Sequence, residues 1–212
     1  MKSKLFSLLT VIITTVLLTF PAVNFAEQTS DPAPVAMLKQ ATDEMLIALK
    51  TNKADIRHNQ SALYRVVKEV IIPHVDENSM AQQVVGREYW ANASNAERQL
   101  FMQEFIKVVI RTYSAAMVSY SDQQVKFSPL REAVDGKTHL EVHSQIVQGN
   151  APAVEVVYRL VLLGQQWKVR DFSVDGISLV QNYRSQFSEV LAQKGFAGLL
   201  EQLSSRNKKS GI

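Results

Sequence analysis

The chain of 212 residues contains no cysteine. It can therefore form no disulfide bond, so its fold depends on packing alone, and its N-terminus cannot be acylated on a cysteine. The sequence also lacks a Gly-x-x-x-x-Gly-Lys-Ser/Thr phosphate loop and a Gly-x-Ser-x-Gly nucleophile turn. Hydrolysis of nucleotides by this chain and α/β-hydrolase chemistry are therefore not expected.

An excess of charge of one sign is also missing. The chain has 23 Lys and Arg residues against 20 Asp and Glu residues. Two of the basic residues, Lys2 and Lys4, lie at the extreme N-terminus, and without them 21 basic residues remain against 20 acidic ones. This balance gives no support for binding to nucleic acid.

The N-terminus has the composition of a signal peptide. Lys2 and Lys4 precede an apolar run over residues 5–20, and small or turn-forming residues follow it. Cleavage is expected after Ala26, which would release a soluble, secreted protein. The alternative is an uncleaved anchor, but a 16-residue run is short for a bilayer span of roughly 20 residues.

The remainder is expected to form one domain. Residues 27–34 are polar and Pro-rich and predict a flexible leader, residues 35–203 predict the folded domain, and residues 204–212 predict a frayed, polar, basic tail.

Helical spacing of apolar residues dominates the first half of the chain. It predicts helices over residues 38–49, 63–71 and 79–85 and a long helix that begins near residue 95. Pro73 is expected to stop the second helix and Gly86 the third. Ser94 and Glu97 form a capping-box pattern before the long helix, and residues 52–59 are expected to be a connection.

The pattern changes to alternation near residue 122. Strands are predicted over residues 125–127, 140–146, 153–163 and 167–174. Asp175-Gly176 predicts a turn, and Ser178 is expected to cap a helix that runs towards residue 193, with a break at Gly195 before a short last helix. The order predicts an α+β fold in which helices cover one face of a curved, four-stranded antiparallel sheet, an NTF2-like cone with an apolar inside.

Two polar groups were candidates for chemistry. His139, Glu141 and His143 share one face of a strand, but the two histidines lie roughly 13 Å apart, too far to bind one metal ion. No metal site is therefore expected there. Asp171 has the same parity as Trp167 and Val169, so it could point into the cone as a general base. The alternative is a structural carboxylate bonded to an arginine or to a backbone amide.

Three stretches together resemble the MlaC family, also called the toluene-tolerance auxiliary family. The residues that carry the resemblance are Trp167, Asp171, Asp175-Gly176-Ile177-Ser178-Leu179, Tyr183-Arg184 and Phe187; Val84-Val85-Gly86-Arg87 with Tyr89-Trp90; and Ala96-Glu97-Arg98 with Phe101, Phe105 and Tyr113. Members of that family are periplasmic, phospholipid-binding components of a lipid ABC transport system. The resemblance implies a carrier that moves phospholipid between outer- and inner-membrane complexes and maintains outer-membrane asymmetry, with no cofactor and no catalytic residues.

The apolar residues expected between sheet and helices are the candidate lipid-binding set. They are Val66, Val70, Ile71, Val84, Phe101, Phe105, Tyr113, Met117, Leu140, Val142, Ile146, Val156, Tyr158, Leu160 and Trp167. Periodicity alone does not separate a cavity from a filled core, and the resemblance is what favours the cavity.

The resemblance also implies partners for a monomeric carrier. These are an inner-membrane ABC complex, reached through its MCE-domain subunit, and an outer-membrane lipoprotein–porin complex. Arg87, Arg184 and Lys194 are candidates for docking or for contact with a lipid head group. Two other classes stay open on sequence: an NTF2-like enzyme that acts on a small hydrophobic substrate with Asp171 as the base, and a periplasmic adaptor that binds no lipid.

Overall fold

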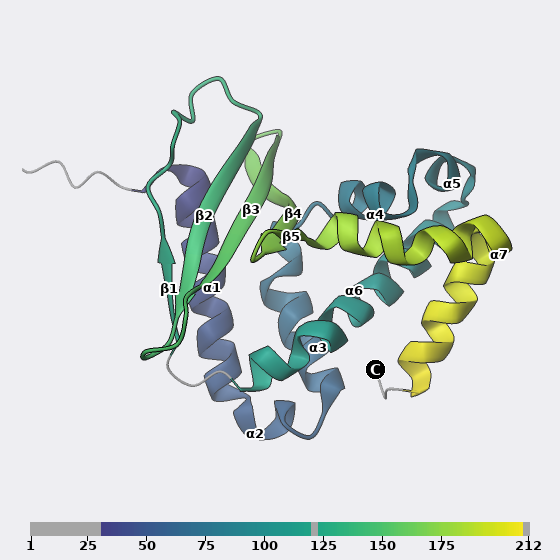
Figure 1. The fold of residues 1–212 in the computed structure, drawn as a ribbon, viewed down its shortest axis with the longest axis horizontal. Coiled ribbons are helices and arrows are strands. Elements are labelled where there is room, and N and C mark those ends of the chain that lie inside the picture. The colour runs from purple at the N-terminus through teal and green to yellow at the C-terminus, as the bar shows by residue number, and fades with distance from the viewer. Residues whose placement is uncertain (1–30, 120–122, 210–212) are drawn as a thin grey trace, which may run out of the picture. The chain divides into compact units, whose positions relative to one another are not determined.

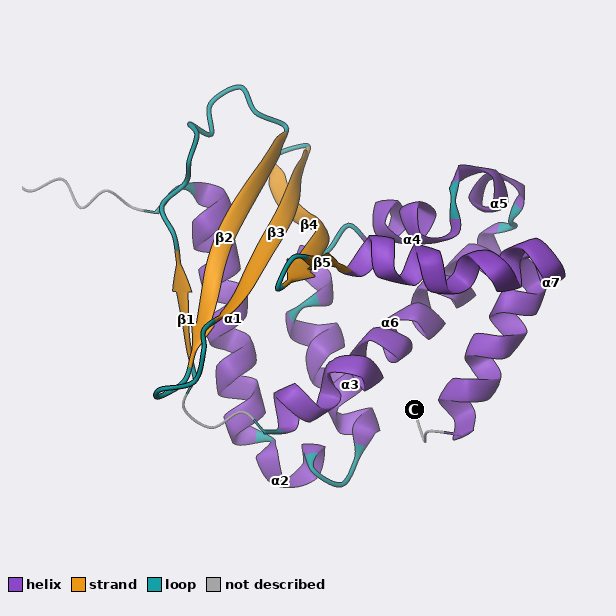
Figure 2. Ribbon diagram, in the orientation of Figure 1, coloured by secondary structure: helices purple, strands orange, loops and turns teal. Residues whose placement is uncertain are grey.

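The computed structural model describes residues 31–119 and 123–209 (Figure 1). The predicted signal peptide, its cleavage site and residues 27–30 of the predicted leader lie outside the described residues and stay predictions. The helices of the first half are α1 (Ala33–Thr51), α2 (Lys53–Ile56), α3 (Gln60–Val70), the 3-10 turn η1 (Ile72–His74), α4 (Glu77–Val85), α5 (Arg87–Asn92) and α6 (Asn95–Val118). The second half contains β1 (Gln124–Phe127), β2 (His139–Val147), β3 (Val154–Leu163), β4 (Gln166–Val174), β5 (Ile177–Ser178) and α7 (Leu179–Lys209) (Figure 2).

The helices follow the predicted order with two additions. Helix α2 lies in the segment expected to be a connection, and α5 lies between Gly86 and the capping box. Both have six residues or fewer, too few for apolar spacing to show a helical period. The capping box is confirmed, because the Glu97 N–H donates to Ser94 Oγ (3.3 Å) and the Ser94 N–H donates to Glu97 Oε2 (2.8 Å). The Ser94 hydroxyl also donates to Glu97 Oε2 (2.7 Å), and this bond, together with the one from the Ser94 N–H, lowers the pKa of Glu97.

The sheet is an open antiparallel meander in the order β1-β2-β3-β4-β5. The four predicted strands are present, which confirms the α+β class, and β5 adds a fifth of two residues. Asp175 (φ 47°) and Gly176 (φ 80°) form the two-residue turn between β4 and β5. Positive φ at both positions is the type I′ geometry that closes a β-hairpin. Ser178 then caps α7 as predicted, because its Oγ accepts from the Gln181 N–H (3.1 Å).

A β-bulge changes which face of β4 its residues occupy. The register between β3 and β4 shifts at Arg159 and Leu160, so that Leu160 pairs with Val169 while Arg159 pairs with Asp171. The extra residue reverses the side-chain alternation along the strand. Trp167 and Val169 therefore lie on the same face as Leu160, whereas Asp171 lies on the opposite face with Arg159.

Helix α7 is bent at Gly195, where the backbone (φ 66°, ψ −170°) is outside the helical region and favours glycine (Figure 1). The break was predicted, but the end of the last helix was not. The helix continues to Lys209, and Asn207 is fully buried, so residues 204–209 are not a frayed tail. Likewise, Ala33 and Pro34 of the predicted leader already belong to α1, and Pro34 is buried.

The buried Asn207 joins the end of α7 to the middle of α6. Its Nδ2 donates to Glu104 O (3.0 Å) and Glu104 Oε2 (2.7 Å), and its Oδ1 accepts from Arg111 Nη1 (3.1 Å). Glu104 is itself buried and also contacts Lys107 Nζ (2.9 Å). Burial of these polar groups is acceptable because each one has a partner, which explains why a polar sequence is ordered here.

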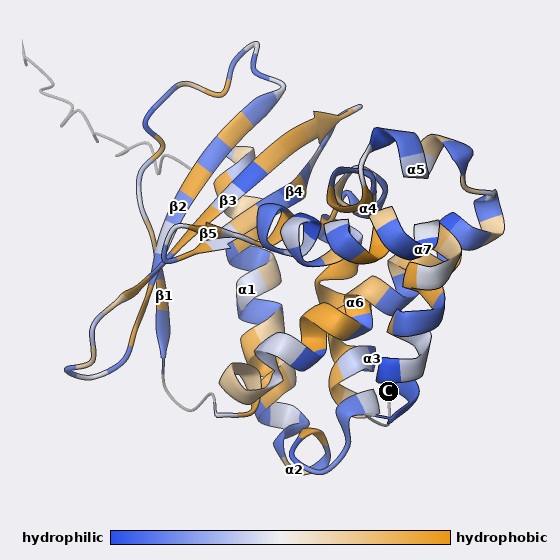
Figure 3. Cartoon of the chain, turned by 45° about the vertical axis from the view of Figure 1, so that its right-hand side comes forward, coloured by the Kyte–Doolittle hydropathy of each residue, from blue (hydrophilic) through white to orange (hydrophobic). Residues whose placement is uncertain are grey.

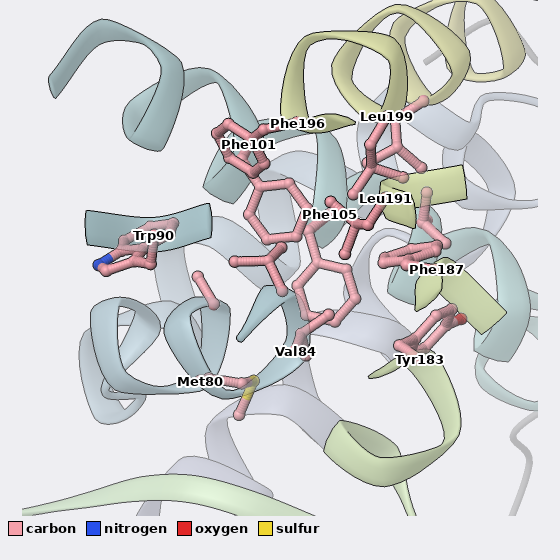
Figure 4. Close-up of a cluster of buried hydrophobic side chains, with 14 of the residues drawn as sticks. Met80, Val84, Trp90, Phe101, Phe105, Tyr183, Phe187, Leu191, Phe196 and Leu199 are labelled. Atoms are coloured by element: carbon pink, nitrogen blue, oxygen red, sulfur yellow. The ribbon is translucent and has the colours of Figure 1, made fainter. Parts of the chain in front are cut away.

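Apolar burial is divided among three clusters in the described residues. The α4–α7 cluster contains Met80, Val84, Trp90, Phe101, Phe105, Tyr183, Phe187, Leu191, Phe196 and Leu199 among others (Figure 4). The α1–α3 cluster contains Met45, Leu49, Ile56, Ala62, Leu63, Val66, Val67 and Ile110. The sheet cluster contains Val35, Leu38, Leu140, Val142, Leu160, Trp167 and Val169. Helix α6 contributes to the first two clusters, and α1 contributes to the last two.

Replacement of Asn207 by leucine tests the junction between α6 and α7. Leucine has the same branched shape as asparagine but is larger and cannot form these hydrogen bonds. The buried Glu104 keeps Lys107 but loses Asn207, and the bond from Arg111 is lost as well, so we expect a loss of about 3 kcal/mol in the free energy of unfolding. Urea denaturation gives the measurement. The control is Ser205→Ala, an exposed site two residues away, for which we expect a change within about 0.5 kcal/mol. Equal effects of the two variants would contradict this account of the C-terminus.

Candidate functional site

One face of the sheet, here called the inner sheet face, is lined with apolar side chains. Leu140 and Val142 of β2 pair with Leu160 and Tyr158 of β3, and Tyr158 pairs with Phe172 of β4. The beginning of α1 covers part of this face, since Val35 and Leu38 pack with Leu140, Leu160 and Trp167. The half-buried Tyr158 and Phe172 lie further along the same face.

Helix α6 turns an apolar stripe towards that part of the sheet. Val109, Tyr113 and Met117 follow one another at four-residue spacing, which places them on one side of the helix, and all three are half-buried. The Tyr113 ring lies 6.0 Å from the Phe172 ring, centroid to centroid, so this side of α6 faces the inner sheet face. Within the described residues, α6 packs mainly on α3, α4 and α7 rather than on the strands.

Half-buried hydrophobic residues lie at the edges of the three clusters. We call them the inner apolar band, and they are Val70 and Ile71 at the end of α3, Val109, Tyr113 and Met117 of α6, Tyr158 of β3 and Phe172 of β4. Figure 3 shows hydrophobic stretches on α6, α3 and α1. All of these side chains keep part of their surface accessible.

Three tyrosines around the band are sheltered from water. Burial raises the pKa of Tyr158, and a hydrogen bond with Ser144 opposes this rise. Burial also raises the pKa of Tyr113 and of Tyr183, and the two rings lie close enough for the second tyrosine to raise that of Tyr113 further. All three therefore stay neutral at ordinary pH, and the band carries no charge from them.

The fifteen candidate lipid-binding residues do not form a single group. Nine are fully buried: Val66, Val84, Phe101, Phe105, Leu140, Val142, Val156, Leu160 and Trp167. The other six are half-buried: Val70, Ile71, Tyr113, Met117, Ile146 and Tyr158. Val84, Phe101 and Phe105 pack together in the α4–α7 cluster, while Leu140, Val142, Leu160 and Trp167 pack together in the sheet cluster. The candidate set did not include Val109 and Phe172, although Val109 is four residues before Tyr113.

Two pockets lie beside α7, and none of the fifteen residues lines them. One, of about 340 Å³, is lined by residues of α7 that include Phe187, Lys194 and Arg206, and the other, of about 210 Å³, lies between α7 and α6. A lipid with two acyl chains needs a site near the upper end of ordinary ligand sites, about 1,000 Å³, so neither pocket is large enough for one. The candidate docking residues Arg87, Arg184 and Lys194 are all exposed, and Lys194 lines the larger pocket.

Asp171 is not placed as a general base in the interior. The bulge turns it to the face opposite Trp167 and Val169, which corrects the expectation from strand parity. Its Oδ2 accepts from Ser178 Oγ (2.7 Å) and Arg159 Nη1 (3.0 Å), and its Oδ1 accepts from the Val180 N–H (3.1 Å). The carboxylate is buried and fastens the first turn of α7 to the sheet, which is the structural role of the alternative interpretation.

The outer sheet face carries the histidines in an array of cross-strand pairs. His143 Nδ1 lies 3.4 Å from Glu155 Oε1, and Glu141 Oε1 lies 3.0 Å from Arg159 Nε. Each of these side chains therefore has a partner on the neighbouring strand.

In the part of the chain that the structure describes, no helix is both long enough and apolar enough to cross a membrane.

Comparison with solved structures identifies the class of proteins that share this fold. The fold is similar to the crystal structure of a phospholipid-binding protein from Ralstonia solanacearum in complex with a phospholipid, with a TM-score of 0.76 and 29% sequence identity over 85% of this chain and 98% of that one. The chain therefore has the α+β fold of a known phospholipid-binding protein.

The family follows from the sequence comparisons. The MlaC protein family matches residues 39–205, and the chain belongs to this family, which confirms the resemblance. It is 28% identical to the toluene tolerance protein ttg2D of Pseudomonas putida over 83% of this chain and 79% of that protein. It is 23% identical to the intermembrane phospholipid transport system binding protein MlaC of Haemophilus influenzae over 94% of this chain and 91% of that protein.

The two carboxylates that share Arg159 provide a matched pair of variants. Asp171→Asn removes a buried charge that accepts three hydrogen bonds, so we expect a loss of about 2 kcal/mol in the free energy of unfolding. Glu141→Gln removes an exposed partner of the same guanidinium and is expected to cost less than about 1 kcal/mol. Chemical denaturation of both variants measures the difference. If Asp171→Asn is as stable as the parent protein, the carboxylate does not fasten α7 to the sheet.

The raised tyrosine pKa values predict a loss of stability in alkaline solution. Because the folded state holds the phenolic proton of Tyr158 more tightly than the unfolded state, its contribution is complete below the unfolded pKa of about 10 and is lost as the pH rises above it. We expect the urea midpoint to fall between about pH 9 and pH 11, and to fall less steeply in Tyr158→Phe. If the urea midpoint falls equally steeply with pH in the two proteins, Tyr158 does not contribute to the loss of stability.

Proposed function

We propose that this protein is a periplasmic phospholipid carrier that holds acyl chains along the inner apolar band. The observation that carries the proposal is the band itself: half-buried hydrophobic side chains of α3, α6 and the sheet lie at the edges of three separate clusters, and Tyr113 of α6 faces Phe172 of the sheet. The bound phospholipid in the similar Ralstonia solanacearum protein supports it. A carrier needs no reacting groups, which agrees with the structural role of Asp171.

The energetics explain why a carrier is needed. Each buried CH₂ group is worth about 0.8 kcal/mol, so one acyl chain of roughly 16 carbons costs on the order of 12 kcal/mol when exposed to water. Free exchange between membranes is therefore negligible, and a protein that crosses the space between them must cover both chains. The head group can stay in water.

The division into clusters suggests how the chains are accommodated. The sheet cluster holds α1 against the strands, and the α4–α7 cluster holds α6 against α7, so each layer keeps its own core if the space between them widens. The nine buried candidate residues then form the walls. The half-buried residues of the band are the ones we assign to direct contact with lipid.

We further propose, from family membership, that the carrier exchanges lipid with an inner-membrane Mla-type ABC complex through its MCE-domain subunit and with an outer-membrane lipoprotein–porin complex. This traffic would maintain the asymmetry of the outer membrane. Arg87 and Arg184, both exposed, remain candidates for docking to these complexes, as does Lys194.

Lipid extraction with a matched pair of variants on α6 tests the carrier function. Protein purified without detergent should yield two-chain phospholipid at near-stoichiometric amounts by mass spectrometry. Met117→Arg places a charge in the band and is expected to lower the lipid content several-fold, because an unpaired charge is costly in an apolar site. Ala115→Arg adds the same charge at an exposed position of α6 and should leave the lipid content unchanged.

The outcomes separate a carrier from an adaptor with a filled interior. Circular dichroism and thermal unfolding establish that both variants are folded before lipid is measured. A parent protein free of lipid that takes none from liposomes would overturn the proposal. Equal lipid content in folded Met117→Arg and in Ala115→Arg would show that the band does not hold the chains.

A further inference from the structure

One side chain in the turn that joins β4 to α7 is not used by the fold. This turn is part of the sequence that resembles the MlaC family. Asp175 and Gly176 close the hairpin with positive φ, and Ser178 caps α7. Leu179 is buried in the α4–α7 cluster. Ile177 has 65% of its surface exposed and, among the described residues, belongs to none of the three apolar clusters.

Exposure alone does not make Ile177 unusual, because single apolar side chains are common on protein surfaces. Ile47 of α1 is 64% exposed and shows the ordinary case. Its neighbours one helical turn away, Asp43, Glu44 and Lys50, are polar and exposed. Ile47 is therefore an isolated apolar residue in a polar surface.

Ile177, in contrast, continues a row of the inner sheet face. Val156 of β3 pairs with Val174 of β4, and Val174 pairs with Ile177 of β5. Residues directly opposite one another in antiparallel strands lie on the same face, and Val156 shares its face with Tyr158, two residues along β3. Exposure rises along this row from 5% at Val156, through the half-buried Val174, to Ile177. The inner sheet face thus reaches the surface at β5.

The inner apolar band adjoins the same row. Phe172 lies two residues before Val174 on the same face of β4, and its ring is 6.0 Å from the Tyr113 ring of α6. Strand β5 forms the edge of the sheet at the point where the chain passes into α7 (Figure 2). Val174 therefore links the band to the exposed Ile177, and the apolar surface is continuous from the interior to the sheet edge.

We propose that the inner apolar band opens to water at the β5 edge and that Ile177 contacts an acyl chain of the bound phospholipid at this opening. The glycerol end of the chain lies against Val174 and Ile177, the rest of the chain follows the band, and the head group stays in water beyond β5. The inference rests on the proposed carrier function and adds to it the place where lipid enters and leaves.

A contact measurement with a fluorescent label tests the opening. The chain has no cysteine, so Ile177→Cys can be labelled with bimane at that position alone. The labelled protein is loaded from phosphatidylglycerol vesicles whose lipid carries a nitroxide near the glycerol end of one acyl chain, and gel filtration removes the vesicles. Nitroxide quenches over short distances, so we expect weaker fluorescence than after loading with the same lipid without nitroxide. A nitroxide at the far end of the chain should quench less.

Ile47→Cys with the same label is the matched control, because the two isoleucines are almost equally exposed. We expect no quenching at this site from either lipid. Mass spectrometry measures the lipid carried by each sample, and circular dichroism checks that each labelled protein is folded. Equal quenching at the two sites would overturn the proposal, because it would show only general adhesion of lipid to the surface.

Two further outcomes separate this proposal from the carrier function. If the protein carries lipid but the label at residue 177 is not quenched, or is quenched more from the far end of the chain, the opening lies elsewhere and the carrier function stands. If the protein takes up no lipid, the carrier function is overturned and this proposal with it.

Serine variants of the same two residues measure the contribution of the contact to affinity. Ile177→Ser should shift the partition of pyrene-labelled phosphatidylglycerol from protein to vesicles about fivefold (about 1 kcal/mol), because apolar contact with the chain is lost. Ile47→Ser should stay within a factor of two of the parent protein (about 0.4 kcal/mol). Both residues are exposed, so the thermal midpoints should stay close to that of the parent. Equal partition in the two variants would contradict the contact.

Discussion

The burial of the two sides of α6 in two different clusters is the constraint on which the rest of the structure depends. Phe101, Phe105 and Val108 pack into the α4–α7 cluster, where the Phe101 and Phe105 rings stack with their centroids 5.6 Å apart. Ile110, on another side of the same helix, packs into the α1–α3 cluster. The helix is thereby held by its helical neighbours, and the side between these two, with Val109 and Tyr113, needs no tight contact with the sheet. The inner apolar band exists because stability is supplied elsewhere.

Polar interactions join the helical part to the sheet at a few buried points. Asp171 fastens the first turn of α7, and the Asp76 N–H donates to the Val169 carbonyl (2.9 Å), which ties the start of α4 to β4. At the other end of α7, Asn207 ties the helix to α6. Such bonds are directional, so they fix the positions of the elements without filling the space between them. A small number of buried hydrogen bonds therefore sets the arrangement of the helices and the sheet, and apolar side chains between them keep some accessible surface.

Much of the fold could be predicted from sequence because its signals are local. The capping box at Ser94 and Glu97, the alternation along β2 and β3 and the break at Gly195 each depend on a few neighbouring residues. The bulge opposite Arg159 could not be predicted, because it arises only when β3 pairs with β4, and it changes the face of Asp171. The helical end of the chain was missed for a similar reason: Asn207 looks like a surface residue until Glu104 and Arg111, about a hundred residues earlier, are brought next to it.

The candidate site was predicted less completely. Periodicity indicates that a residue is buried, but it does not indicate against what, so Phe101 and Leu140 were placed in one set although they belong to different clusters. Only the resemblance to a family provided functional information that spacing could not.

The elbow in α7 has a mechanical consequence. The arm before Gly195 is fastened to β4 through Asp171 and also packs on Phe105 of α6 through Tyr183 and Phe187. The arm after Gly195 is tied to α6 through Asn207. Any separation of the strands from the helical layer would therefore strain the first arm, because both layers hold it.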